Sequence, residues 1–158
     1  MKRETEYFIV IAPPGPVCDY VKQLKNFCKR NIGSFYSAGS RAHISFGKFI
    51  DEENSPGQMS GIMRQCLHLM EKGISRIPPC NIMIDGFRFF DHGPRFKTIY
   101  AAVKLDEKTL DWFNAVGEQL LIDRDITPHI TIARKIPVES FNVLWPHFKD
   151  LKFKESFS

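Results

Sequence analysis

Two four-residue stretches, His43-Ile44-Ser45-Phe46 and His129-Ile130-Thr131-Ile132, are one motif written twice. Each places a histidine and a hydroxyl residue two positions apart, with an apolar residue after each, inside a run typical of a β-strand. Side chains along a strand alternate between its two faces, so the histidine and the hydroxyl residue of each motif share one face. If the two strands are neighbours, the sequence predicts two imidazoles and two hydroxyls on one face of a sheet.

The segments around the motifs alternate between strand and helix patterns. Period-two runs predict strands at Tyr7–Ile11, Arg41–Ile50, Asn81–Phe90, Phe96–Lys104 and Ile126–Ile136, with a further extended segment at Leu151–Ser158. Apolar residues at helical spacing predict helices at Val17–Ile32, Met59–Lys72, Asp106–Leu121 and Val138–Phe148. Turns are expected over Asp51–Gly57 and over Asp91-His92-Gly93-Pro94, the second of these closing a hairpin.

This order predicts an α+β fold with one motif at a comparable place in each half of the chain. We expect a single domain over residues 1–158, built of two lobes related by a pseudo-twofold axis and sharing an antiparallel core. The motifs lie more than half a chain length apart, which suits such a duplicated arrangement.

The composition is that of an ordinary soluble globular protein, with 158 residues, 43% hydrophobic and 25% charged. A net charge of +4 mildly favours anionic ligands such as nucleotides or RNA. No apolar stretch reaches the length of a membrane span, and the early apolar run is too short for a signal peptide. We therefore expect a cytoplasmic protein without membrane contact, monomeric, with reduced thiols.

The four cysteines do not indicate a metal site. None forms a C-x-x-C pair, and none shares a short window with two histidines. The remaining histidines, His68, His92 and His147, lack a hydroxyl residue two positions on and are expected outside any site.

The paired motifs resemble those of the two-histidine (2H) phosphoesterase superfamily, close to its 2′-5′ RNA ligase and cyclic phosphodiesterase branch. The strand-like start before Pro13-Pro14 and the Thr127-Pro128 pair before the second motif add to this resemblance. It implies a bilobal fold in which two antiparallel sheets form a central cleft, with the helices packed outside and the motifs lining the cleft. Members of this family usually finish with a full strand, so the sequence ending at Ser158 implies a short or incomplete final strand.

The resemblance also implies metal-independent work on cyclic phosphodiesters, 2′-5′ linkages or RNA ends. His43 and His129 would be the catalytic pair, and Ser45 and Thr131 would bind phosphate oxygens. Elementary chemistry agrees, because histidine titrates near pH ~6.5 and a pair can hold one neutral base and one protonated acid. Hydroxyl donors can stabilise the charge on the non-bridging oxygens. No cofactor and no metal ion is expected.

A cation follows each motif histidine at the fifth position, Lys48 in the first motif and Arg134 in the second. Strand parity puts both on the face opposite the histidines unless a bulge intervenes. At the rim of the cleft they would attract substrate phosphate, whereas at a solvated strand end they would have no role. Tyr100 is expected to pack in the core rather than to stack on a base.

Three other functions compete with a phosphoesterase. A member of the same fold could bind nucleotides or RNA without turnover. An RRM-like RNA-binding module suits the element order, although Gly86-Phe87-Arg88-Phe89-Phe90 only loosely echoes the aromatic signature of that family. A metalloenzyme would use the histidines as ligands, but neither motif has a carboxylate or a further histidine at ligand spacing.

Overall fold

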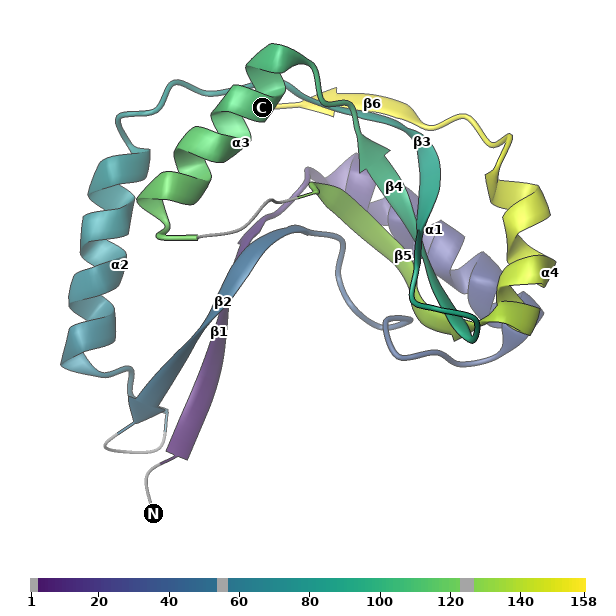
Figure 1. The fold of residues 1–158 in the computed structure, drawn as a ribbon, viewed down its shortest axis with the longest axis horizontal. Coiled ribbons are helices and arrows are strands. Elements are labelled where there is room, and N and C mark those ends of the chain that lie inside the picture. Colours follow the sequence, from purple (N-terminus) through teal and green to yellow (C-terminus); the bar gives the residue numbers. More distant parts are fainter. Residues whose placement is uncertain (1–2, 54–56, 123–126) are drawn as a thin grey trace. The chain divides into compact units, whose positions relative to one another are not determined.

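The computed structural model describes residues 3–53, 57–122 and 127–158. Ten elements follow one another in the predicted order, so the α+β class is confirmed (Figure 1). They are β1 (Arg3–Ile11), α1 (Gly15–Ile32), β2 (Ile44–Glu53), α2 (Gly61–Ile74), β3 (Ile82–Asp91), β4 (Phe96–Val103), α3 (Glu107–Gln119), β5 (His129–Pro137), α4 (Val138–Phe148) and β6 (Lys154–Phe157).

Element boundaries differ from the predictions by a few residues. Strand β2 begins at Ile44 and runs to Glu53, so the first part of the turn expected over Asp51–Gly57 is strand. Residues 54–56 of that turn lie outside the described residues. Strand β5 begins at His129, and Ile126, where the strand was expected to begin, also lies outside them.

All six strands belong to one hydrogen-bonded order, β1-β2-β5-β4-β3-β6. The expectation of two separate antiparallel sheets is therefore corrected to a single six-stranded one. The strands form one sheet because the first residue of β2, Ile44, pairs antiparallel with Ile130 of β5.

The chain divides into two compact units, and neither corresponds to a sequence half. Each is assembled from three segments: unit 1 from residues 1–10, 45–80 and 105–127, and unit 2 from residues 11–44, 81–104 and 128–158.

Unit 2 contains the antiparallel strands β5, β4, β3 and β6, with helices α1 and α4 in contact with each other and with β5. Its core is aliphatic and aromatic: the Phe87 ring meets Phe148 edge to face at 5.0 Å and stacks on Phe153 at 5.7 Å between ring centroids. The four residues of β6 pair with the first four of β3. Helix α1 begins at a proline pair and ends at Gly33, whose positive φ of 79° suits glycine.

Unit 1 combines β1 and most of β2 with helices α2 and α3, which contact each other. Both helices have side-chain caps. Ser60 Oγ accepts a hydrogen bond from the Met63 N–H, and the Asp106 carboxylate accepts one from the Thr109 N–H. Phe46 packs on Phe113 with 5.5 Å between ring centroids, so the second apolar residue of the first motif lies in the core of this unit.

Within the described residues, no helix has both the length and the apolar character needed to cross a bilayer.

Candidate active site

The two motif histidines directly precede Ile44 and Ile130, through which β2 pairs with β5. Ile44 and Ile130 are paired and fully buried, which fixes the core face of both strands. His43 directly precedes β2, one residue outside the strand predicted to contain it, and His129 is the first residue of β5. Because side chains alternate, the two histidines belong to the face opposite the isoleucines, and both are half-buried. Diagonal neighbours of this kind lie about 7–8 Å apart, with their Cβ atoms somewhat closer.

His43 is oriented by the backbone of the segment that leads into β2. Its Nδ1 lies 2.8 Å from the carbonyl oxygen of Arg41. A carbonyl only accepts, so Nδ1 carries the proton of this hydrogen bond, and Nε2 of the neutral ring is left as the acceptor. A ring held in this tautomer presents a basic nitrogen on its far edge.

His129 is oriented by aromatic rings. Its ring meets Phe90 edge to face at 4.9 Å and Tyr100 at 5.2 Å between centroids, and Phe90 stacks on Tyr100 at 4.2 Å. The three rings come from β5, β3 and β4, so the sheet itself positions this imidazole.

A bulge in β5 lies directly after the second motif. Tyr100 pairs with Thr131 and Ile99 pairs with Ala133, so Ile132 is an extra residue on the β5 side. Consistent with this, the consecutive residues Ile132 and Ala133 are both fully buried. The bulge reverses the parity of the strand from this point onward.

Arg134 is thereby returned to the same face as His129 and Thr131. Its backbone N–H donates to Ser37 Oγ at 3.0 Å, and its guanidinium carbon lies 5.8 Å from the centre of the Tyr36 ring. The next residue, Lys135, has a φ of 47°, which marks the second irregularity in the β4–β5 register.

Ser45 and Lys48, the other two predicted site residues, belong to unit 1. Ser45 is half-buried in β2, and the exposed Lys48 forms an ion pair with Glu6 at 2.7 Å. The structure therefore brings together four of the predicted site residues within one unit, namely His43, His129, Thr131 and Arg134.

Two polar residues of this face were not predicted as site residues. Tyr100 lies opposite Thr131 on β5 and opposite Arg88 on β3, so all three share the face of His129. Burial raises the pKa of the Tyr100 hydroxyl, and the nearby Arg88 charge partly offsets the effect. The hydroxyl is therefore a proton donor at neutral pH. In the sequence, the signal that could have identified these two site residues was Arg88 itself, a charged residue in an otherwise apolar run.

The remaining histidines lie elsewhere. His68 is exposed on α2, His147 stacks on Phe27 at the end of α4, and His92 is exposed in the hairpin turn with its Nε2 2.8 Å from Thr98 Oγ1. Across the residues that the structure describes, no three His, Cys, Asp or Glu side chains gather in a group suited to a metal ion.

The chain matches a known protein family. The family described as the 2′-5′ RNA ligase superfamily matches residues 13–158. The chain belongs to this superfamily, which is the 2H phosphoesterase superfamily and acts on RNA or nucleotide phosphodiesters. The RRM-like alternative is thereby set aside. Among curated proteins, none matches the chain significantly.

Proposed function

We propose that the protein is a metal-independent phosphoesterase that hydrolyses 2′,3′-cyclic or RNA-end phosphodiesters, or 2′-5′ linkages, with His43 and His129 as its acid–base pair. The observation that carries this proposal is the register at Ile44 and Ile130, because it gives both imidazoles one face. Membership of a superfamily that acts on such phosphodiesters supports the same conclusion.

Opening a cyclic phosphodiester requires two proton transfers. One histidine, neutral, takes a proton from water as its oxygen attacks phosphorus. The other, protonated, gives a proton to the ribose oxygen as its bond to phosphorus breaks. Imidazole serves either role, since its neutral form accepts a proton and its protonated form donates one. The Nε2 of His43 suits either role, since its Nδ1 is bonded to the Arg41 carbonyl.

Negative charge on the non-bridging oxygens has candidate partners on the same face. The Thr131 hydroxyl and the protonated Tyr100 hydroxyl are donors, and Arg88 and Arg134 supply positive charge. We include Ser45 as a second hydroxyl donor and Lys48 as a further source of attraction for phosphate. With no covalent intermediate required, positioning and charge stabilisation supply the rest of the rate.

The test is a substrate panel assayed in EDTA: nucleoside 2′,3′-cyclic phosphates, ADP-ribose 1″,2″-cyclic phosphate and 2′-5′ dinucleotides. We expect turnover of at least one of these, with no loss of rate on chelation. Loss of turnover on chelation would overturn the metal-independent scheme. Binding of a panel member without turnover would instead identify a non-catalytic nucleotide-binding member of the fold.

A further inference from the structure

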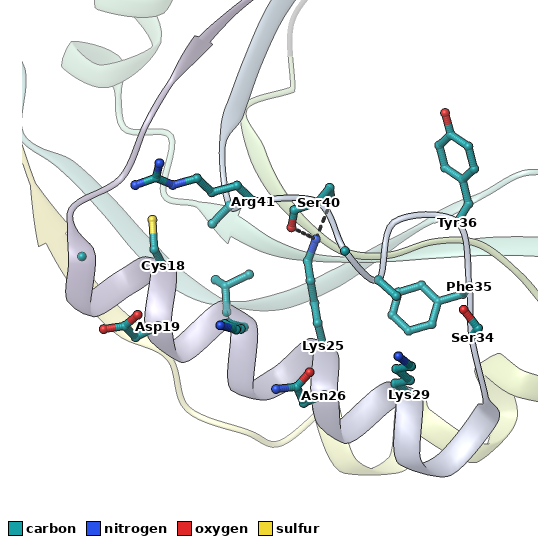
Figure 2. A pocket seen from close by; sticks show the side chains of 16 residues that line it. Cys18, Asp19, Lys25, Asn26, Lys29, Ser34, Phe35, Tyr36, Ser40 and Arg41 are labelled. Atoms are coloured by element: carbon teal, nitrogen blue, oxygen red, sulfur yellow. Dashed lines mark hydrogen bonds between the residues drawn. The ribbon is translucent and has the colours of Figure 1, made fainter.

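Unit 2 contains a pocket that none of the proposed catalytic residues lines. It lies between helix α1 and the segment 33–42, which leads from α1 to His43, and its volume is about 790 Å³ (Figure 2). This volume lies within the range of small-molecule and cofactor sites. Because both walls belong to unit 2, the pocket and the two histidines belong to one compact body.

The pocket wall is strongly cationic. Lys22, Lys25 and Lys29 line it from α1 at spacings of three and four residues, which puts them on one side of the helix. Arg41 adds a fourth positive charge from the opposite wall, and Asp19 is the single acidic residue among those that line it. A pocket with three surplus positive charges favours an anionic ligand.

Two of these lysines are available to a ligand and one is not. The Lys25 ammonium is buried and donates to the carbonyl oxygens of Ser37 and Ser40 and to Ser40 Oγ, all at 2.8–2.9 Å. The dashed lines in Figure 2 mark the bonds to Ser40. Lys22 and Lys29 are exposed, and the described part of the chain offers neither an ion-pair partner. Lys25 therefore shapes the wall, and Lys22 and Lys29 present free charge.

The same segment connects the pocket to the histidine face at two points. The Arg41 carbonyl holds His43, and Tyr36, which is 88% exposed, lies over Arg134. Figure 2 shows the Tyr36 ring directed away from α1, at the edge of the pocket. An exposed aromatic ring beside an arginine offers a stacking surface for a nucleobase.

We propose that this pocket binds the nucleotide adjacent to the reacting phosphodiester of a single-stranded RNA, and so makes an oligonucleotide a better substrate than a mononucleotide. The inference rests on the proposed function. RNA fits because its charge repeats along the backbone, so one strand can place one phosphate at the histidines and another at Lys22 and Lys29. Single-stranded binding sites in general combine a cationic groove with aromatic stacking surfaces.

The experiment compares a nucleoside 2′,3′-cyclic phosphate with an oligoribonucleotide that ends in the same group. In the double variant Lys22→Ala/Lys29→Ala we expect KM for the oligonucleotide to rise on the order of tenfold, with mononucleotide kcat/KM unchanged. The slope of log kcat/KM against log salt for the oligonucleotide should flatten by about 0.7, since the lysine pair contacts one phosphate and each phosphate contact to a single strand contributes about 0.7. The matched control is Lys149→Ala/Lys152→Ala, which removes two exposed lysines that do not line the pocket.

Three outcomes would overturn the subsite: an unchanged oligonucleotide KM, an equal loss on the mononucleotide, or an equal effect of the control pair. If neither substrate is cleaved, the proposed function fails and the pocket is tested separately. Fluorescence anisotropy with a labelled single-stranded oligoribonucleotide should then show binding that the Lys22/Lys29 variant weakens and the control does not. Equal binding by all three proteins would refute the pocket as an RNA site.

Discussion

At the scale of single residues, the two motif histidines are oriented by different neighbours, a carbonyl for His43 and aromatic rings for His129. Replacing either with alanine removes one proton transfer. We expect each of His43→Ala and His129→Ala to lower kcat/KM for a nucleoside 2′,3′-cyclic phosphate by about 10²–10⁴-fold, the usual contribution of a general acid or base. The control is His68→Ala, an exposed histidine on α2. A near-wild-type rate in either variant would remove that histidine from the mechanism.

Removing a hydroxyl group of the motifs should lower the rate less than removing a histidine does. Thr131 lies opposite Tyr100, and in Thr131→Ala we expect kcat to fall by up to about 10³-fold, the scale of one donor to a developing oxyanion. Thr131→Ser keeps the hydroxyl and should retain most of the rate. Ser45→Ala tests the corresponding donor of the first motif. If Thr131→Ser is as impaired as Thr131→Ala, the methyl group and not the hydroxyl is what matters.

Lys25 gives a prediction about stability and pH. Burial lowers the pKa of its ammonium from 10.5 to about 8, an effect that the nearby Cys28 opposes in part. Between these two pH values the unfolded chain keeps a proton that the folded chain has lost. The free energy of unfolding contributed by this group therefore rises with pH across that window, by up to about 1.4 kcal/mol per pH unit.

Denaturant unfolding of wild type and Lys25→Met at several pH values isolates this contribution. We expect wild type to gain stability relative to the variant from about pH 8 to about pH 10.5. Lys22→Met, at an exposed position one turn earlier on α1, should show no such trend. A difference that stays constant or shrinks with rising pH would contradict the assigned cause.

At the scale of elements, β5 shows where sequence patterns stop being informative. His129 and Thr131 could be placed on one face because alternation holds over three residues. Arg134 could not, because the extra residue at Ile132 reverses parity and no local signal marks it. Tyr100 and Arg88 were missed for a related reason. Their position depends on the β3–β4–β5 register, which is set by distant pairing and interrupted by a shift near Gly86.

The second irregularity of β5 lies at Lys135, whose φ is 47°. Glycine adopts this backbone conformation freely, whereas a β-branched residue adopts it poorly. The Lys135 N–H donates to Thr98 Oγ1 at 2.9 Å. We expect Lys135→Val to lower the free energy of unfolding by roughly 1–2 kcal/mol and to reduce activity by misplacing Arg134. Lys135→Gly should keep both stability and activity, which separates backbone geometry from loss of the lysine charge. Equal behaviour of the two variants would contradict the backbone explanation.

At the scale of the whole molecule, the sequence predicted the order of elements but not how they are shared between the units. Each unit takes three separate segments of the chain. Local periodicity identifies a strand or helix, but it carries no information about which distant segment that element will join. The pairing at Ile44 and Ile130, on which the candidate site depends, is of this long-range kind.

This interleaving predicts that the two units unfold together, because neither can fold from a continuous piece of chain and losing one releases the segment ends of the other. The chain carries one tryptophan in each unit, Trp112 in unit 1 and Trp145 in unit 2. In Trp112→Phe and Trp145→Phe the remaining indole reports one unit, and we expect its urea midpoint to coincide with that from far-UV circular dichroism of the same variant. Leu144→Ala truncates a fully buried side chain of unit 2 and should lower the free energy of unfolding by about 2–5 kcal/mol. Added to each of the two tryptophan variants, it should shift the Trp112 transition and the Trp145 transition by the same amount. A Trp112 transition that stays in place while the Trp145 transition moves would show that the units unfold independently.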